Sequence, residues 1–149
     1  MFLGGSSINL DAKGRLALPT RYRALLTEHC DGHMVLSVRQ DGSLLLYPLP
    51  EWQELERKLT RLPNQGSRAH LLQRMMLGFA TEVDMDGQGR ILITPRLREF
   101  ANLEKRVELN GLGNKFEICN ETSWDKACTD WKNDQSDSDL PSVLDDLSI

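Results

Sequence analysis

The residues best suited to chemistry in this 149-residue chain are arginines, and they occur in two matching sets. Each set opens with the pattern Asp-x-x-Gly-Arg, at residues 11–15 and again at residues 86–90. Two further arginines follow each pattern six and eight positions later, namely Arg21 and Arg23, then Arg96 and Arg98. A guanidinium holds a permanent charge and a planar fork of donors, which suits bidentate contacts to guanine or phosphate. The pattern therefore predicts binding of a nucleic acid.

Within each pattern the residue types have different expected roles. The glycine can take the positive φ that a tight hairpin needs, and the aspartate can form a salt bridge that pins the turn. That salt bridge can be purely structural, or it can orient the arginine fork toward DNA, and both interpretations can hold at once. We expect loop orientation from Asp11, Gly14, Asp86 and Gly89, and DNA contacts from Lys13, Arg15, Arg21, Arg23 and Arg90.

The two loops are not identical in charge. Gln88 stands in the second loop where Lys13 stands in the first, so the first tip is the more basic. We therefore expect the first loop to be the main DNA contact and the second to serve the fold or a subunit interface. The arginines of the following helices are expected to combine a solvated face with phosphate contacts.

Other chemistry finds little support. The stretch His-Cys-Asp-Gly-His at residues 29–33 looks like a fragment of a metal site, but no second ligand cluster completes a tetrahedron. Residues 84–89 open like a calcium loop, yet Pro95 occupies the position of the required glutamate. No nucleophile and base are paired in a motif. We therefore expect no enzyme activity, no metal site and no cofactor.

The distribution of charge predicts that any basic surface is confined to one part of the protein. The formal net charge is −4, but residues 120–149 alone account for −6, which leaves +2 on the rest. An acidic total therefore does not exclude an anionic partner. No apolar run approaches the ~20 residues of a membrane span. The three cysteines lack CxxC spacing, and the first residues carry no export signal, so we expect a cytoplasmic protein with no membrane partner.

The arginine patterns belong to a longer internal repeat. Residues 4–26 reappear 75 positions later without a gap, and the similarity continues at an offset of 72, where Val35, Leu46 and Trp52 meet Val107, Ile118 and Trp124. A unit of roughly 60 residues buries too little surface to be comfortable alone. The sequence thus predicts one pseudo-symmetric domain and not two independent units.

Hydrophobic spacing and turn residues predict the elements that position the loops. In the first unit we expect strands at 5–10, 15–18, 33–39 and 43–47, and helices at 21–28, from 50 and at 67–77. Thr20 is the expected cap of the first helix. The second unit repeats this order with strands at 79–85, 90–93, 105–110 and 115–119, and helices from 95 and at 122–131. Residues 132–149 are rich in Ser and Asp and are interpreted as a tail.

The repeated Asp-x-x-Gly-Arg hairpin, followed by alternating apolar residues, a proline and an arginine-rich helix, resembles the AbrB/SpoVT swapped-hairpin DNA-binding unit. Two such units in one chain, together with residues 47–52 and 77–80, resemble the MraZ family over residues 1–131. The resemblance implies a β-rich α+β fold, in which two swapped-hairpin repeats form one pseudo-two-fold β-barrel with flanking helices. The expected divisions are repeats at 4–52 and 78–131, linking helices at 53–77 and an acidic tail at 132–149.

The same resemblance implies a function. It predicts a sequence-specific transcriptional regulator, nucleoid-associated, that acts on the division and cell-wall gene cluster containing its own gene. Related proteins assemble into closed rings and bind short direct repeats in promoter DNA, so double-stranded DNA and further copies of the chain are the expected partners. The alternative is an antitoxin-like interaction module whose acidic tail docks a partner.

Overall fold

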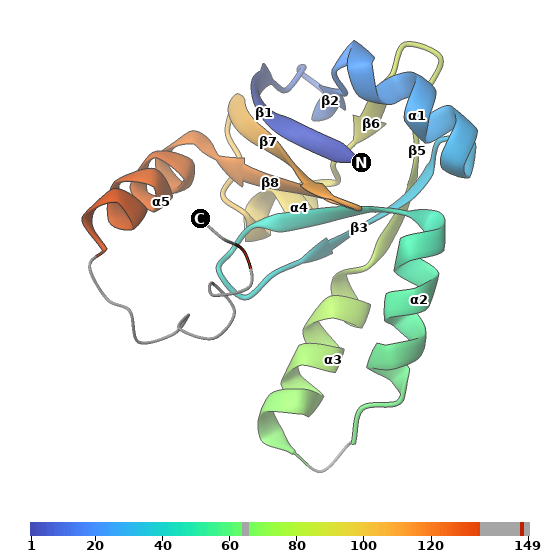
Figure 1. Cartoon of the computed structure of the whole chain (residues 1–149), viewed down its shortest axis with the longest axis vertical. Coiled ribbons are helices and arrows are strands. Elements are labelled where there is room, and N and C mark those ends of the chain that lie inside the picture. The colour runs from blue at the N-terminus through green and yellow to red at the C-terminus, as the bar shows by residue number, and fades with distance from the viewer. Residues whose placement is uncertain (64–65, 135–146, 148–149) are drawn as a thin grey trace.

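The computed structural model describes residues 1–63, 66–134 and 147. Its centre is an antiparallel sheet of six strands in the order β1-β7-β8-β4-β3-β5 (Figure 1). These strands are β1 (Phe2–Asn9), β3 (His33–Val38), β4 (Leu44–Pro48), β5 (Thr81–Asp84), β7 (Arg106–Gly113) and β8 (Phe116–Asn120). Two short strands, β2 (Arg15–Ala17) and β6 (Arg90–Leu92), pair with each other in a separate ribbon.

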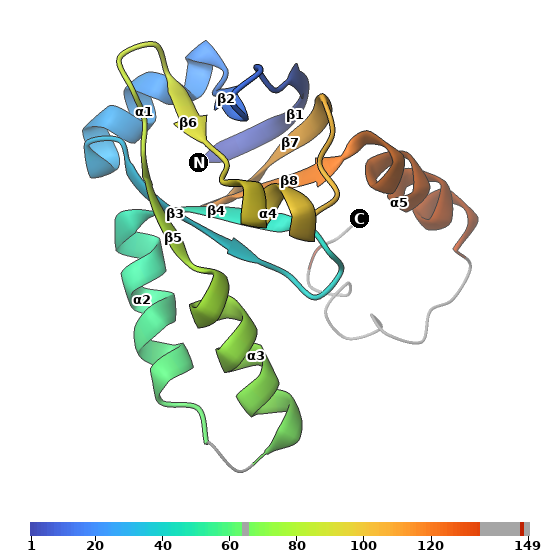
Figure 2. The ribbon, with the colours of Figure 1, turned by 180° about the vertical axis from the view of Figure 1, so that it is seen from behind.

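Five helices of the described chain connect and flank the strands. They are α1 (Thr20–Cys30), α2 (Leu49–Thr60), α3 (Ser67–Phe79), α4 (Pro95–Phe100) and α5 (Glu121–Asn133). The α2–α3 pair projects from one end of the sheet, and α5 lies at the opposite side (Figures 1 and 2). None of the helices in the described ranges has the length and apolar character needed to cross a membrane.

The two repeats exchange strands. β1 of the first repeat pairs along its whole length with β7 of the second, and β5 of the second pairs with β3 of the first. At the centre, Leu45 of β4 faces Glu117 of β8, and these residues occupy equivalent positions in the two repeats. Leu16 of β2 faces its own equivalent, Ile91 of β6, in the same way. A pseudo-two-fold relation therefore passes through both pairs, which places the two repeats in a single folding unit.

Of the expected pseudo-two-fold β-barrel, the structure shows the two repeats but no closed barrel: the described strands form an open sheet and a ribbon. Closure requires the strands at the two ends of a sheet to pair around the circle. Here β1 and β5 end the sheet order, while β2 and β6 are only three residues long and pair with each other. The α+β class and the two-repeat organisation are as predicted.

The main core lies between the sheet and the ribbon. Leu16 and Ile91 point into it from the ribbon with 0% and 1% exposure, and Phe116 of β8 packs against Phe2 and Tyr22. A second cluster covers the other face of the sheet under α2 and α3, and consists of Val35, Leu45, Tyr47, Trp52, Leu59 and Met76. Both repeats contribute to the main core, whereas the second cluster belongs to the first repeat and α3.

The register corrects the alignment of the repeats. β1 pairs Ile8 with Val107, and β5 pairs Val83 with Met34. Because Ile8 and Val83 are equivalent, Val107 is the equivalent of Met34 and not of Val35. Val35 consequently lies in the second cluster. The expected cap of α1 also shifts, because Pro19 holds the N-cap position and Thr20 is the first helical residue.

Candidate nucleic-acid interface

The ribbon β2–β6 presents both Asp-x-x-Gly-Arg arginines on one face. Successive side chains of a strand point to opposite sides, and the ribbon buries Leu16 and Ile91. Arg15 and Arg90 therefore project from the outer side, where Arg15 lies opposite Leu92 and Arg90 opposite Ala17. Arg15 and Arg90 are diagonal neighbours in an antiparallel pair, a separation of about 7–8 Å between such positions. The result is one outward surface that carries two guanidinium groups.

Asp11 organises the first loop through three contacts. Its Oδ1 accepts hydrogen bonds from the backbone amides of Lys13 and Arg15, each 2.9 Å, and its Oδ2 lies 2.7 Å from Arg15 Nε. The bond from the Arg15 amide is the largest of the effects that lower the pKa of Asp11 to about 2. The carboxylate therefore stays ionised and holds the guanidinium in place.

The second loop repeats this geometry almost atom for atom. Asp86 accepts bonds of 2.9 Å from the amides of Gln88 and Arg90, and a further bond of 2.9 Å from Arg90 Nε. The Arg90 amide is likewise the main reason why the pKa of Asp86 is lowered. Among the described contacts each ion pair uses Nε, so the two Nη groups of each arginine take no part in it.

Each loop glycine lies against an arginine of the other repeat. Gly14 and Gly89 have φ of +84° and +76°, and a Cβ added at Gly89 would lie 2.1 Å from Arg23 Nε. Arg23 itself donates through Nε to the Leu18 carbonyl at 2.7 Å, and Arg98 does the same to Ile93 at 3.0 Å over Gly14. Glycine at these positions therefore provides the turn conformation and also the space that the crossing arginine needs.

The crossing arginines are the part of the site that sequence reasoning missed. Arg23 was expected to contact DNA, but the structure places its Nε between Leu18 and the turn of the opposite repeat. Its equivalent Arg98 was expected, with the other helix arginines, to combine a solvated face with phosphate contacts, and not to cross to the other repeat. The available signal was the identical position of these two residues, eight residues beyond Arg15 and Arg90.

The remaining predicted residues lie around the ribbon. Lys13 is exposed at the tip of the first loop, as Gln88 is at the second. Arg21 is exposed on α1, where it donates to Ser6 Oγ at 3.1 Å and stacks 4.5 Å from the centre of the Tyr22 ring. The structure thus brings Lys13, Arg15 and Arg90 to the loops and the ribbon, and holds Arg21 against β1.

The two histidines of residues 29–33 each contact a carboxylate. His29 lies 2.8 Å from Glu51, and His33 Nδ1 lies 2.6 Å from Asp84. The bond to Asp84 is the main cause that raises the pKa of His33. Within the described residues no group of three potential ligands is arranged to hold a metal ion.

The three cysteines are free thiols. Burial is the first cause that raises the pKa of Cys119, which reaches about 12. A thiol with so high a pKa is a poor nucleophile, so Cys119 is a packing residue.

Two interlocked hairpin repeats, each with an aspartate-oriented arginine, define a class of small pseudo-symmetric proteins. A model of the MraZ protein family, described as antitoxin-like, matches residues 1–75 and again residues 76–141. The chain therefore belongs to the MraZ family, as its sequence indicated, and this membership confirms the prediction of a non-enzymatic protein.

Curated relatives match the chain over most or all of its length. It is 48% identical over 150 residues to the transcriptional regulator MraZ of Thioalkalivibrio sulfidiphilus, with all of both chains covered. The protein of the same name from Methylococcus capsulatus is 52% identical over 136 residues, with 91% of this chain and 90% of the relative covered. That from Pseudomonas aeruginosa (strain LESB58) is 44% identical over the full length of both. The family is one of transcriptional regulators.

Proposed function

We propose that this chain is a sequence-specific transcriptional regulator that binds double-stranded DNA with the outer face of the ribbon β2–β6. The observation that carries the proposal is the position of Arg15 and Arg90 on that face, each held through Nε by an aspartate. A two-stranded ribbon fits the major groove, and an arginine fork can bind the O6 and N7 atoms of guanine. Lys13 adds charge at the first tip, so the first loop contributes more to DNA binding than the second.

We also propose that several copies act together. One protomer offers few cations on the ribbon and a net charge of −4, so it binds DNA weakly by itself. Linked contacts from a closed homo-oligomeric ring raise avidity by about 10²–10⁴-fold without any new contact. The matching DNA is a set of short direct repeats in a promoter. The target that we propose is the division and cell-wall gene cluster that includes the chain's own gene, in the cytoplasm at the nucleoid.

Alanine substitution of the ribbon arginines tests the DNA-binding face. With DNA from upstream of the chain's own gene as probe, Arg15→Ala should cost about 1–3 kcal/mol for each lost bidentate contact. Arg90→Ala should cost less DNA affinity, because its loop carries no lysine, and should cost more stability or assembly. Arg61→Ala removes an exposed arginine at the end of α2 and serves as the matched control. Equal losses from all three variants, with folding intact, would contradict the proposed face.

Salt and repeat number test the role of several copies. If Lys13, Arg15 and Arg21 neutralise phosphates, affinity falls steeply as salt rises, because bound counterions are released. A ring should give a steeper slope than the cations of one protomer permit, and DNA with several repeats should bind much more tightly than DNA with one. A slope near one, or no gain from added repeats, would exclude the multivalent arrangement.

An antitoxin-like function is the alternative. It is favoured by the description of the matched family and by the acidic residues after α5, which could dock a protein partner. Deletion after Trp131 separates the two functions, because it should abolish partner capture and leave DNA binding by the ribbon unchanged.

A further inference from the structure

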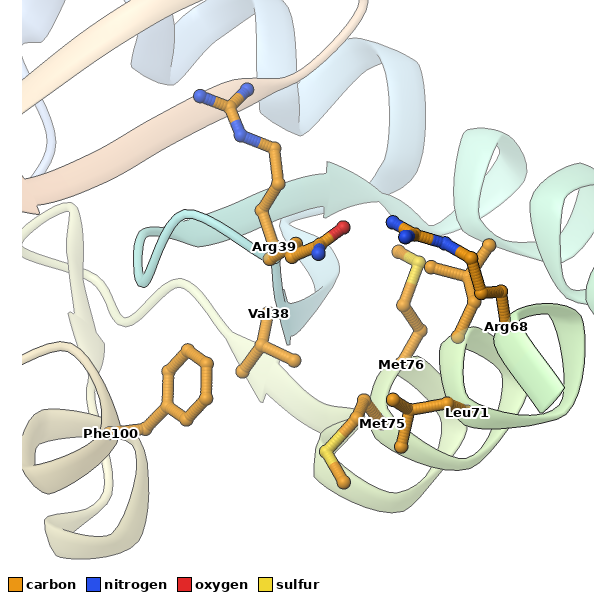
Figure 3. A pocket seen from close by; sticks show the side chains of 9 residues that line it. Val38, Arg39, Arg68, Leu71, Met75, Met76 and Phe100 are labelled. Atoms are coloured by element: carbon orange, nitrogen blue, oxygen red, sulfur yellow. The ribbon is translucent and has the colours of Figure 1, made fainter.

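An apolar groove lies far from the ribbon, between α3, the end of β3 and α4. Met75, Met76 and Leu71 of α3 form one wall, and Val38 and Phe100 form the other (Figure 3). We call this the α3 groove. Leu71, Leu72 and Met75 are 52%, 46% and 37% exposed, which is high for neighbouring side chains of this size. Contiguous exposed apolar surface of this kind marks a binding site for another segment or protein.

The charge around the α3 groove is positive. α3 carries Arg68 and Arg74 and contains no acidic residue. The guanidinium of Arg68 extends over the mouth of the groove beside Met76 (Figure 3). An occupant of this groove should therefore combine an apolar face with negative charge.

The end of the same chain has this combination. Residues 134–149 contain five aspartates and no basic residue. Four large apolar residues recur at the i, i+3, i+4 and i+7 spacing of a helix that binds in a groove, namely Leu140, Val143, Leu144 and Leu147. The geometry points to the α3 groove as the docking site for residues 139–149 of this chain. Leu147 is 55% exposed and is not among the residues that line the groove, so docking requires it to move there.

The pseudo-two-fold relation offers this segment another place, and the residues there argue against it. At the offset of 72, Val143, Leu144 and Leu147 correspond to Leu71, Leu72 and Met75 of α3. An equivalent of α3 would lie on β7 and β8 beside α5. There the sheet presents Glu108 and Glu117 at the positions of Val35 and Leu45. Glu108 and the buried Glu117, which pairs with Arg39, would give the apolar face of this segment no apolar partner.

Arg39 connects the surroundings of the α3 groove with those of α5. Arg39 lines the α3 groove and also a second depression, which α5 borders with Asp130. Arg39 forms ion pairs with Asp41 and Glu117, which hold its side chain between the α3 groove and the second depression. Residues 134–138 span up to about 17 Å when extended.

Hydrogen exchange of α3 in the full-length protein tests the docking. Val143→Asp with Leu144→Asp should accelerate exchange of the α3 amides by about tenfold, because the cover is lost. Ser138→Asp with Ser142→Asp adds the same charge away from the apolar positions and should leave α3 unchanged. Equal exchange in both variants, or acceleration confined to β7 and α5, would overturn the proposal.

Two further measurements keep the result specific. Arg68→Glu with Arg74→Glu should expose α3, and adding Asp145→Lys with Asp146→Lys should restore its protection; no restoration would contradict the charge argument. Isotope-labelled intact chains are then mixed with the Val143→Asp, Leu144→Asp variant. Docking within a chain predicts that each α3 follows its own tail. If instead the α3 amides of labelled and variant chains showed the same intermediate protection, the C-terminal segments would be docking on other copies, and docking within one chain would be overturned.

Discussion

Replacing Gly89 with alanine perturbs the contact that locks the two repeats together. The residue has a φ of +76°, where a side chain costs about 1–2 kcal/mol relative to glycine. The new Cβ would also lie 2.1 Å from Arg23 Nε and 2.4 Å from its Cδ, so Arg23 must move. Arg23 then loses its 2.7 Å hydrogen bond to the Leu18 carbonyl.

The size of the effect follows from these two losses. A hydrogen bond from a charged donor contributes about 1.5–3 kcal/mol, and the half-buried position of Arg23 puts it near the lower end. Gly89→Ala should therefore lower the free energy of unfolding by about 2.5–4 kcal/mol. Gly42→Ala is the matched control, because Gly42 has a φ of +93° and open space where the Cβ would be. Gly42→Ala should lower the free energy of unfolding only through the unfavourable positive φ, by about 1–2 kcal/mol.

Urea unfolding of the single and double variants decides the matter. In a background of Arg23→Ala the clash and the hydrogen bond are both absent, so Gly89→Ala should cost no more than Gly42→Ala. The difference between the two backgrounds measures the coupling across the repeats, expected at about 1–2 kcal/mol. If Gly89→Ala cost the same in both backgrounds, the crossing arginine would have no part in the stability of the turn.

Two other predictions address the fold and its pH dependence. A fragment of residues 1–77 leaves β1 without β7 and β4 without β8, so it should be unfolded or form a homodimer, while the intact chain melts in one transition. Light scattering measures the mass of the fragment and calorimetry its melting. A fragment that is monomeric and melts in a sharp transition would refute this prediction. His33 has a raised pKa because of Asp84, so its stabilising effect is full below about pH 6.5 and is lost as the pH rises through its folded pKa. Urea midpoints of the intact chain and His33→Gln should accordingly converge as the pH rises above about 6.5, and a gap that widens with rising pH would contradict the pairing.

Much of the fold was predictable because local spacing and an internal repeat are properties of sequence. The hairpin turns, the strand and helix positions and the family all followed from residues such as Asp11, Gly14 and Arg15 and their copies. The one-residue shift of Val35 was not predictable, because the repeats differ in length before β3 and in the turn after it. Only pairing with β5 and β7 shows where those differences fall.

The closure of the sheet and the function of the crossing arginines depended on tertiary structure. Alternation of apolar residues shows that a strand has two faces, but it does not say which strand will pair with which. The exchange of β1 and β5 between repeats set that order and left an open sheet. It also brought Arg23 over Gly89 and Arg98 over Gly14, contacts between segments 66 and 84 residues apart. The sequence by itself determined which residues carry charge and where the chain turns; the packing of one repeat through the other decided which charges hold the fold and which face outward.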